Sequence, residues 1–408
     1  MSCRSCNGND LRLILSLGST PLANALLTRE QLDEPEPRYP LDLVHCRNCS
    51  LVQITETVAP ELLFREYVYF SSFSDTVLSN AKAVAESMTE RLRLGTSSLV
   101  AEIASNDGYL LQFYKELKVP VLGIEPARNI ASIARDQRGI PTIEEFFGED
   151  LGYRLRHTGT RADVIHANNV LAHVPDLNGF VRGLACFLKD SGAAVIEVPY
   201  VKSMLDDLEF DTIYHEHLCY FSLTSLTNVL HRAGLEVFDV EQIPIHGGSL
   251  RVFARKMGST TAGHAPAVTA LLAEERRWRV AEDSVYQDFG TRVPLLREEL
   301  TRTLRDLKAA GARIAAYGAS AKGSTLLNYC GVDSALVDYV VDRNTYKQGR
   351  FSPGTHLPIL APEYLLSDRP DYVLLLTWNF AAEILAQQDA YRRAGGRFIV
   401  PVPDVRVV

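Results

Sequence analysis

The chain has 408 residues, of which 46% are hydrophobic and 23% charged, and its formal net charge is −8. This length predicts two or three domains, and the composition is that of a folded globular protein rather than of a disordered or collagen-like chain. Because an acidic chain repels phosphate backbones, we expect no nucleic-acid partner. An anionic substrate would need a local basic pocket.

No stretch of the sequence approaches the roughly 20 apolar residues of a membrane span, and the N-terminus MSCRSCNGND has no apolar signal-peptide core. We therefore expect a cytoplasmic protein with no membrane partner. In that compartment, thiols or metal ligands are expected from the seven cysteines rather than disulfides.

Four cysteines lie in a small, strand-rich N-terminal segment, as the two knuckles Cys3-x-x-Cys6 and Cys46-x-x-Cys49. Four thiolates suit tetrahedral Zn²⁺ and leave no open coordination position. The pattern therefore predicts a structural zinc site, which would also stabilise a segment too small to fold on burial alone. Two unrelated pairs, or a redox pair, are the alternative.

The middle of the chain alternates strands and helices after a helical lead-in over residues 59–96. This alternation predicts an α/β fold with a doubly wound parallel sheet, which binds ligands at the carboxyl ends of its strands. A helix at 223–234 and further strands are expected to complete the same sheet. The expected strands are 98–103, 119–125, 162–167, 193–198, 235–240 and 249–255, and the expected helices of the alternating part include 107–118 and 127–136.

Two further regions follow. Residues 266–310 indicate long helices with an apolar stripe for core packing, and residues 311–408 resume the β/α pattern as a second Rossmann-like domain. Its expected strands are 313–317, 336–341, 371–377 and 397–401. The predicted divisions are a zinc-binding module at 1–57, a Rossmann-like core with its lead-in at 58–256, a helical connector at 257–310 and a C-terminal domain at 311–408.

The first candidate ligand loop is Ala104-Ser-Asn-Asp-Gly108, between strand 98–103 and a helix. Glu125 ends the next strand, where a carboxylate can accept both ribose hydroxyls of a nucleoside. A dinucleotide loop normally carries G-x-G-x-x-G, and Glu102 and Asp107 add negative charge that disfavours a pyrophosphate. The loop therefore favours a cationic sulfonium such as S-adenosylmethionine, with an ordinary βα turn as the alternative.

Polar residues also cluster after later strands. Asn168, Asn169 and His173 follow strand 162–167, at the carboxyl edge of the predicted sheet, and the two asparagines are candidate cofactor contacts. A lone histidine there is more often a satisfied local residue than a functional one.

The segment Tyr214-His-Glu-His217 is denser. If it is extended, Tyr214 and Glu216 face one way and His215 and His217 the other. A histidine paired with a carboxylate can have its tautomer fixed and its basicity raised. A polar surface loop is the alternative interpretation.

Two weaker candidates accompany these residues. His246 precedes a glycine pair that allows close backbone approach to a ligand, although a plain hairpin turn would explain the same pattern. Tyr67 and Tyr69 interrupt the helical lead-in and could form a lid over a site or merely pack against the core.

The C-terminal domain supplies the basic pocket. Gly318-Ala-Ser-Ala-Lys-Gly323 follows a buried strand and opens a helix, so backbone amides near Ser320 together with Lys322 suit a phosphate. Asp342 closes the next strand, and Arg343 and Lys347 follow it. A degenerate domain kept for stability is the alternative.

This order of motifs resembles the S-adenosylmethionine-dependent sugar C-methyltransferases of deoxysugar and antibiotic biosynthesis. The similarity covers essentially the whole chain: the cysteine quartet, Glu-Ile-Ala-Ser-Asn-Asp-Gly, Asn-Val-Leu-Ala-His-Val, Tyr-His-Glu-His, His-Gly-Gly-Ser-Leu-Arg and Gly-Ala-Ser-Ala-Lys-Gly. It implies methylation of a carbon next to the ketone, C3 or alternatively C5, of a dTDP-linked 4-keto-6-deoxysugar. The sequence departs from the general methyltransferase loop G-x-G-x-G at Ala104 and Asn106.

The resemblance also implies roles for particular residues. His217 would be the general base, and Tyr214, Glu216 and His173 would line the sugar and orient its reacting centre, under a lid from Tyr67 or Tyr69. The loop at Asn106, Asp107 and Gly108, with Glu125, would hold the methyl donor. The loop carrying Lys322 would hold the nucleotide diphosphate. The further candidate contacts to the substrate are His215, His246, Ser320, Asp342, Arg343 and Lys347.

Three alternatives remain at this stage: a C-methyltransferase acting on a non-sugar ketone, a nicotinamide-dependent oxidoreductase with two Rossmann-like units, and a zinc-knuckle interaction protein with vestigial α/β domains. The departure from G-x-G-x-x-G argues against the second, and the concentration of His, Tyr and Glu at 214–217 argues against the third. We expect a monomer.

Overall fold

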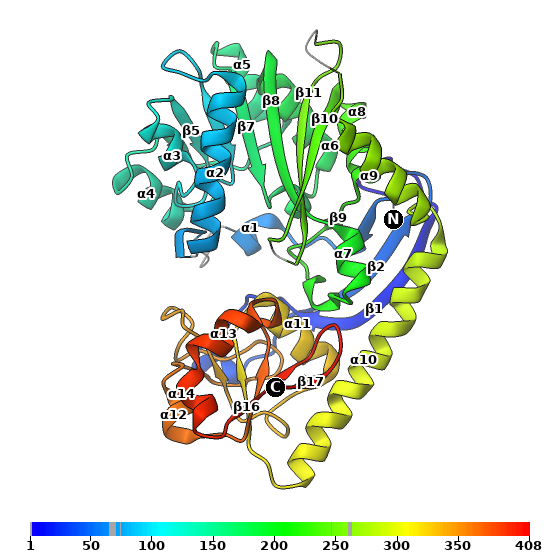
Figure 1. The fold of residues 1–408 in the computed structure, drawn as a ribbon, viewed down its shortest axis with the longest axis vertical. Coiled ribbons are helices and arrows are strands. Elements are labelled where there is room, and N and C mark those ends of the chain that lie inside the picture. The colour runs from blue at the N-terminus through cyan, green and yellow to red at the C-terminus, as the bar shows by residue number, and fades with distance from the viewer. Residues whose placement is uncertain (1, 65–70, 74, 246, 260–262) are drawn as a thin grey trace.

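The computed structural model describes residues 2–64, 71–73, 75–245, 247–259 and 263–408. Three sheets form three parts of the molecule, and one long helix, α10 (Asp283–Ala309), runs from the core lobe to the C-terminal lobe (Figure 1). Within the described ranges, no helix is both long and apolar enough to cross a membrane.

The core lobe is built on a seven-stranded sheet of order β10-β11-β8-β7-β4-β5-β6. The five strands from β8 to β6 are parallel, whereas β10 and β11 are antiparallel additions at one edge. The strands are β4 (Val100–Ile103), β5 (Val121–Ile124), β6 (Thr142–Ile143), β7 (Ala162–Asn168), β8 (Leu188–Pro199), β10 (Leu235–Ile243) and β11 (Ser249–Lys256).

Helices cover both faces of this sheet (Figure 1), as a parallel sheet requires because its strands are apolar on both sides. All four residues of β4 are buried. The expected Rossmann-like core is therefore confirmed. The helices are α2 (Asp75–Leu92), α3 (Leu111–Glu116), α4 (Arg128–Asp136), α5 (Glu149–His157), α6 (Leu177–Phe187) and α8 (Leu223–Arg232).

The helix expected at 107–118 is shorter than predicted. Gly108 donates its amide to the Ser105 carbonyl, so a tight turn occupies the residues before α3. That turn leaves the loop after β4 open at the carboxyl edge of the sheet.

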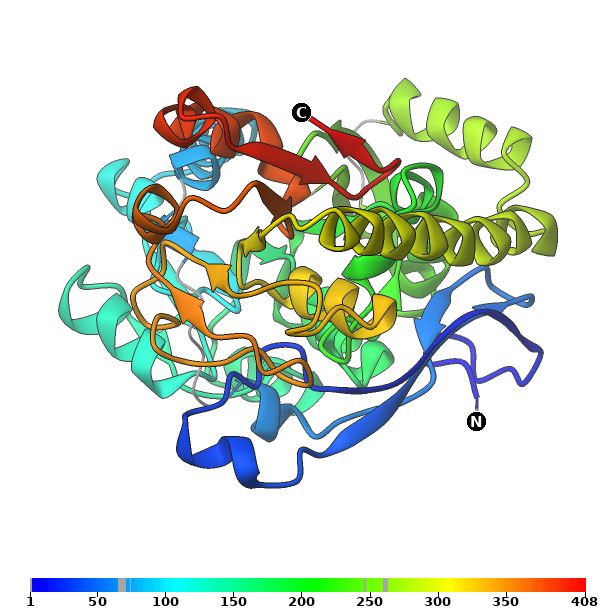
Figure 2. The ribbon, with the colours of Figure 1, turned by 90° about the horizontal axis from the view of Figure 1, so that it is seen from below.

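The N-terminal module is a four-stranded sheet of order β1-β2-β3-β9. Its last strand, β9 (Cys219–Tyr220), comes from the core lobe, so the two parts share a sheet. The other strands are β1 (Leu11–Pro21), β2 (Arg38–Cys46) and β3 (Val52–Ile54), followed by the short helix α1 (Pro60–Phe64). The strand β1 contacts α10 and the C-terminal helix α11 (Ala321–Cys330), and the view from below shows the blue N-terminal strands along the lower edge of the molecule (Figure 2).

The C-terminal lobe has a six-stranded sheet of order β14-β13-β12-β15-β16-β17, parallel except for the pair β16–β17. The strand expected at 336–341 is confined to two residues, because Leu336 and Val337 donate to the Asp333 carbonyl in a turn. The strands are β12 (Ile314–Tyr317), β13 (Val340–Val341), β14 (Ile359–Leu360), β15 (Tyr372–Leu375), β16 (Arg397–Val400) and β17 (Arg406–Val407), and the helices are α11 (Ala321–Cys330), α12 (Tyr364–Asp368), α13 (Ala381–Gln387) and α14 (Asp389–Arg393).

The expected helical connector consists of α9 (Pro266–Arg277) and α10. Leu296, Leu300 and Leu304 of the predicted stripe are buried, and Leu307 packs against the same core. This core is continuous through the N-terminal sheet, the core lobe and the C-terminal lobe. The predicted domain boundaries at residues 57, 256 and 310 stay a prediction.

Candidate functional site

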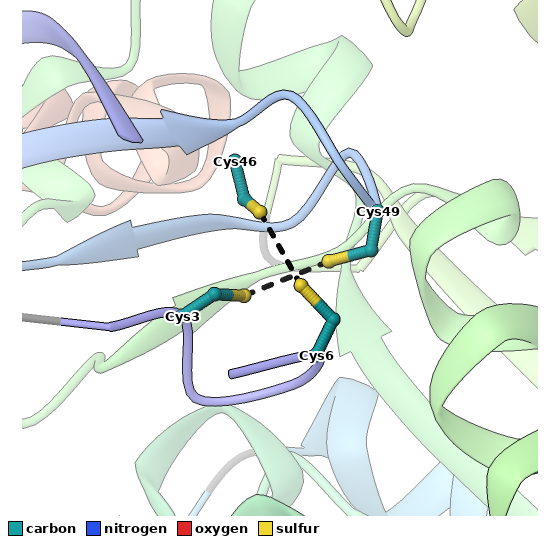
Figure 3. Close-up of side chains that lie close together, drawn as sticks. All are labelled: Cys3, Cys6, Cys46 and Cys49. Carbon is teal, nitrogen blue, oxygen red and sulfur yellow. Dashed lines mark hydrogen bonds between the residues drawn. The ribbon is translucent and has the colours of Figure 1, made fainter. Parts of the chain in front are cut away.

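The four cysteines of the two knuckles come together at one end of the N-terminal sheet (Figure 3). All four Sγ atoms lie within 4.8 Å of one another, and the pairs Cys3–Cys49 and Cys6–Cys46 are each 3.6 Å apart. Thiolates about 2.3 Å from a tetrahedral zinc ion are roughly 3.8 Å from each other, so this spacing fits zinc. With sulfur at every position, the site is structural.

The loop after β4 has the backbone of a glycine-rich loop although it contains one glycine. Ala104, Asn106 and Gly108 have φ angles of 53°, 50° and 78°. These three positions match the glycines of G-x-G-x-G, which explains why that pattern usually has glycine there. Glycine is favoured at position 108 by its φ of 78°, and a Cβ there would also lie 2.3 Å from Cδ1 at the end of the Ile140 side chain.

Two buried carboxyl groups lie beneath this loop. Glu125 accepts the backbone amides of Asn106 and Ala127, each at 2.9 Å, and burial raises its pKa to about 7. Burial also raises the pKa of Glu102 far above its usual range, and its two oxygens have no hydrogen-bond partner among the described residues. A buried carboxyl group without donors, as at Glu102, suits a cationic ligand and opposes a pyrophosphate, so the site fits S-adenosylmethionine.

The polar side chains of the loop are held by neighbouring segments. Asp107 pairs with Arg138 at 2.9 Å and accepts the Ser72 hydroxyl, while the Asn106 side chain accepts the Ser71 amide at 3.0 Å. The segment 71–73 thus packs directly on the loop. Asp107 therefore holds the loop in place through its contacts with Arg138 and Ser72.

Asn168 and Asn169 stand at the carboxyl end of β7, beside that loop. They line a small cavity together with Asn80, Tyr109 and Glu197. The side-chain oxygen of Asn168 is buried and has no hydrogen-bond partner in the described part of the chain. Asn169 has a φ of 52° and donates its amide to the Glu197 carbonyl. This edge offers further unsatisfied polar atoms to a ligand.

Tyr214, His217 and His173 form one cluster. The Tyr214 hydroxyl lies 2.9 Å from Nε2 of His217, and the His217 ring centroid is 4.9 Å from that of His173. The segment is not extended, because His217 donates its amide to the Tyr214 carbonyl in a turn. Residues three apart therefore face each other, and tyrosine and histidine meet directly.

Backbone carbonyls fix the tautomers of both histidines. Nδ1 of His217 lies 2.8 Å from the Thr212 carbonyl, and Nδ1 of His173 lies 2.6 Å from the Glu216 carbonyl. Since a carbonyl only accepts, each Nδ1 carries the hydrogen in the neutral ring and each Nε2 keeps its lone pair. Burial lowers the pKa of His173 to about 4, so this ring is neutral at pH 7.

Glu216 is the point where three parts of the chain meet. Its carboxyl group accepts a hydrogen bond of 2.6 Å from Asn24 of the N-terminal module. Burial raises its pKa to about 7, while Asn24 and the charge of Lys347 in the C-terminal lobe oppose that shift. His215 points away from the cluster: its Nε2 lies 3.1 Å from the Pro40 carbonyl, and the side chain is buried. The structure does not bring His215 to the other candidates.

The C-terminal candidates gather at the carboxyl edge of their sheet. Ser320 caps α11 by accepting the Gly323 amide, and Asp342 accepts the Ala319 amide at 2.7 Å. Lys347 donates to the Ala319 carbonyl at 2.8 Å. The exposed Arg343 lies 3.9 Å from Glu383.

Lys322 departs from the expectation. Its Nζ lies 3.1 Å from Glu209 of the core lobe and 4.9 Å from the ring of Trp378. Its side chain is 16% exposed, so most of this cation is already covered. Tyr67, Tyr69 and His246 lie outside the described residues.

Two residues in these contacts were not expected from the sequence. Asn24 stands 192 positions before the glutamate it contacts, in a segment without any motif. Asp211 is fully buried and accepts the Trp378 indole at 2.7 Å, but it precedes the histidine segment as an unremarked acid. Neither contact has a sequence signal, because each joins different parts of the fold.

Three family models match successive parts of the chain. They are described as "Putative zinc binding domain" over residues 3–64, "Methyltransferase domain" over 79–240 and "C-methyltransferase C-terminal domain" over 244–403. The C-methyltransferase NovU of Streptomyces niveus is 38% identical over 408 residues, which is 100% of this chain and 96% of NovU. The chain belongs to the C-methyltransferase family.

This C-methyltransferase is an S-adenosylmethionine-dependent enzyme with a zinc-binding N-terminal module, as the sequence predicted. The assignment decides against the nicotinamide-dependent oxidoreductase and the interaction protein.

Two solved structures are less similar to this C-methyltransferase than NovU is. The glycopeptide N-methyltransferase MtfA complexed with S-adenosylmethionine is 12% identical, with 43% of this chain and 94% of MtfA covered and a TM-score of 0.33. Magnesium protoporphyrin IX methyltransferase from Synechocystis PCC 6803 is 11% identical, with 44% and 82% covered and a TM-score of 0.34. Similarities this low do not assign a function to the chain.

Proposed function

We propose that this enzyme methylates a carbon next to the ketone, C3 or alternatively C5, of a dTDP-linked 4-keto-6-deoxysugar, with His217 as the general base. The observation that carries the proposal is the His217 ring, whose Nδ1 is bound to the Thr212 carbonyl and whose Nε2 faces the Tyr214 hydroxyl. A neutral imidazole with a fixed tautomer and a phenol beside it is what enolisation of a ketone needs.

The steps follow from these atoms. Nε2 of His217 takes the proton from the carbon next to the ketone, and the electron pair of that C–H bond moves onto the ketone oxygen. Tyr214 donates its hydroxyl hydrogen bond to this oxygen once substrate displaces the contact with His217. Bound S-adenosylmethionine supplies an electrophilic methyl group on sulfur. Transfer of that methyl group to the enolate carbon would leave the electron pair of the broken sulfur–methyl bond on the sulfur.

The loop after β4 is proposed to hold the methyl donor. Asn106 and Gly108 give the backbone its open shape, Glu125 is placed for the ribose hydroxyls, and Glu102 and Asn168 carry unsatisfied oxygens for the cationic end. His173 links the two halves of the site, because it lies on the turn η3 (Leu171–His173) directly after β7 and touches the His217 ring.

The C-terminal lobe is proposed to hold the nucleotide diphosphate. The amides at the start of α11 near Ser320, with Lys347 and Arg343, offer positive charge at one sheet edge. Lys347 also acts electrostatically on Glu216, so a diphosphate there would bring its sugar to the histidine cluster.

We further propose a monomer that works in the cytoplasm. All seven cysteines, each in the described part of the chain, are unpaired, which fits a reducing compartment.

The role of His217 is tested by His217→Asn. We expect methyl transfer to fall by roughly 100- to 10,000-fold, the usual contribution of a general base, while S-adenosylmethionine affinity measured by calorimetry stays unchanged. His157→Asn on the exposed side of α5 is the matched control and should keep full activity. Near-normal turnover of His217→Asn would remove this residue as the base.

The acceptor is tested by incubating the enzyme and methyl donor with a panel of dTDP-4-keto-deoxysugars and analysing the products by mass spectrometry. We expect one methyl group to be added to at least one member. Solvent deuterium exchange at the acceptor carbon without methyl donor should occur in wild type and be lost in His217→Asn. Methylation of simple ketones but of no sugar nucleotide would instead support a non-sugar acceptor.

A further inference from the structure

The short turn η4 (Phe210–Thr212) lies directly before the histidine segment and sets the position of His217. Its last carbonyl, on Thr212, accepts from Nδ1 of His217 at 2.8 Å and from the Tyr220 hydroxyl at 3.2 Å. Any shift of η4 therefore moves the acceptor that holds the Nδ1 hydrogen. Without that acceptor, the neutral ring can take the other tautomer, which has no lone pair on Nε2.

The turn η4 is held by the C-terminal lobe. Nε1 of Trp378, on the turn η5 (Trp378–Phe380) after β15, donates to Asp211 at 2.7 Å. Asp211 has no exposed surface, and burial raises the pKa of its carboxyl group while the charge of Lys322 opposes that shift. The Phe210 ring packs on Tyr329 of α11, with centroids 5.3 Å apart.

Lys322 belongs to the same contact between lobes. Besides its 3.1 Å bond to Glu209, it lies over the ring of Trp378. Glu209 is 5% exposed at its side chain, so this ion pair is largely shielded from water. A lysine that already neutralises Glu209 and faces Asp211 has little charge left for a diphosphate.

We propose that Asp211, held by the Trp378 indole, is a positioning residue that fixes the tautomer of His217 through the Thr212 carbonyl. The C-terminal lobe then contributes to the proton transfer itself as well as to binding. Lys322 holds the two lobes together at this point and does not bind the diphosphate. The inference rests on the proposed role of His217.

The test compares Trp378→Phe with Trp278→Phe, which alters the other tryptophan of the chain. Trp278 packs edge-on against Tyr286 near the start of α10 and takes no part in this contact, so its variant controls for the loss of an indole. Asp211→Asn, which keeps an oxygen acceptor for the indole, is compared with Asp211→Ala, which does not. Activity is measured with the dTDP-sugar that supports turnover.

We expect Trp378→Phe and Asp211→Ala to lower kcat by about 10- to 100-fold, as small displacements of a reacting group do, with KM for the sugar nucleotide changed by less than about 3-fold. Asp211→Asn should recover most of kcat, and Trp278→Phe should resemble wild type. A wild-type kcat for Trp378→Phe, or an unchanged kcat with a KM raised more than about 10-fold, would overturn the proposal. Should Asp211→Ala not fold, Trp378→Phe decides.

A second readout does not depend on turnover. Nitrogen-15 NMR of labelled histidine rings, with the His217 signals assigned by their loss in His217→Asn, reports the tautomer directly. We expect hydrogen on Nδ1 in wild type and a mixture of tautomers in Trp378→Phe. An unchanged tautomer would overturn the positioning role. If His217→Asn keeps its activity but the tautomer still changes in Trp378→Phe, the proposed base fails while the positioning contact stands.

Discussion

At the scale of single residues, the loop after β4 holds two non-glycine residues in a backbone region that favours glycine. Ala104 and Asn106 have φ angles of 53° and 50°, and an L-residue pays roughly 1–2 kcal/mol there. The neighbouring Gly108, at 78°, has no room for a side chain because of Ile140. The five-residue loop 104–108 therefore combines backbone strain with close packing.

We predict opposite effects for two substitutions in this loop. Ala104→Gly should raise the free energy of unfolding by about 0.5–1 kcal/mol, because relief of strain exceeds the added chain entropy. Gly108→Ala should lower it by about 1–2 kcal/mol and weaken S-adenosylmethionine binding, because alanine is disfavoured at a φ of 78° and the end of the Ile140 side chain would have to move. Urea unfolding and calorimetry measure both. Equal effects of the two changes would contradict the assigned backbone.

His166 gives a prediction on pH. It lies in β7 with no exposed surface, Nε2 is 2.8 Å from the Tyr114 hydroxyl, and burial, with the charge of Arg251, lowers its pKa to about 3. Below pH 6.5 the unfolded chain binds a proton at this residue that the folded chain does not, so its contribution makes stability fall as pH drops toward 3.

The matched variant is His166→Gln, which keeps a polar group beside Tyr114 but does not titrate. The difference in unfolding free energy, wild type minus variant, should fall by about 1.4 kcal/mol per pH unit between pH 6 and pH 4. Urea unfolding across that range measures it. A difference that stays constant with pH would show that His166 is protonated in the folded state or is not buried.

At the scale of elements, the docking of β1 on α10 depends on one glycine of the helix. A Cβ on Gly290 would lie 2.2 Å from the Ile14 carbonyl oxygen, which belongs to the backbone and cannot rotate away. We predict that Gly290→Ala lowers the free energy of unfolding by about 2 kcal/mol or more, although alanine favours a helix. The exposed neighbour Thr291→Ala is the control and should change it by less than about 0.5 kcal/mol. A stabilised Gly290→Ala in urea unfolding would contradict the close packing.

Strands with a continuous apolar run were predictable, whereas short or irregular ones were harder to find. The all-buried run of β4 gives a clear signal, so the longer parallel core strands were found from the sequence, but the two-residue β6 was not. The strand β1 was missed because register shifts at Leu13–Leu15 and Ser16–Ser19 break its alternation. The turn at Tyr214–His217 was not predictable, because no residue in this segment marks a turn.

The residues that the structure brings together could be picked out from the sequence where a motif is local. The cysteine pairs, the loop after β4 and the tyrosine–histidine segment each carry their chemistry within a few residues. Lys322 pairs with Glu209, which lies 113 positions earlier in the chain. Nothing in the sequence around Lys322 indicates this acidic partner, so the lysine at a helix start was interpreted as a phosphate contact. Such partners become visible only when the lobes are assembled.

At the scale of the whole molecule, the zinc-binding module joins the two lobes. Leu27 and Phe351 exchange backbone hydrogen bonds of 3.0 and 2.9 Å, and Glu36 accepts from the Gly354 amide at 3.0 Å and lies 2.6 Å from His356. The zinc knuckle itself is anchored on the core lobe. There Asn178 donates to the carbonyls of residues 4 and 5, and Asn228 donates to the Cys49 carbonyl at 3.3 Å. The module therefore ties the C-terminal lobe to the core on the side of Glu216.

Loss of zinc should consequently reach the site through Asn24. We predict that Cys46→Ala loses bound zinc and lowers the melting temperature, because four thiols without metal no longer hold the knuckle. Methyl transfer should fall by about 10-fold or more as Asn24 leaves the Glu216 carboxyl group, whereas S-adenosylmethionine affinity should change by less than about 3-fold because the core lobe alone forms that loop.

The control is Cys186→Ala, which removes a buried thiol of the core lobe outside the cluster and should keep both zinc and activity. Zinc content by atomic emission, melting by calorimetry and turnover are compared for both variants. Asn24→Ala in the zinc-loaded protein should reproduce the loss of activity without the loss of metal, since it removes the contact and leaves the knuckle intact. A metal-free Cys46→Ala that is stable and fully active would mean that the N-terminal strands dock without zinc, and that the route from the metal through Asn24 to the site does not exist.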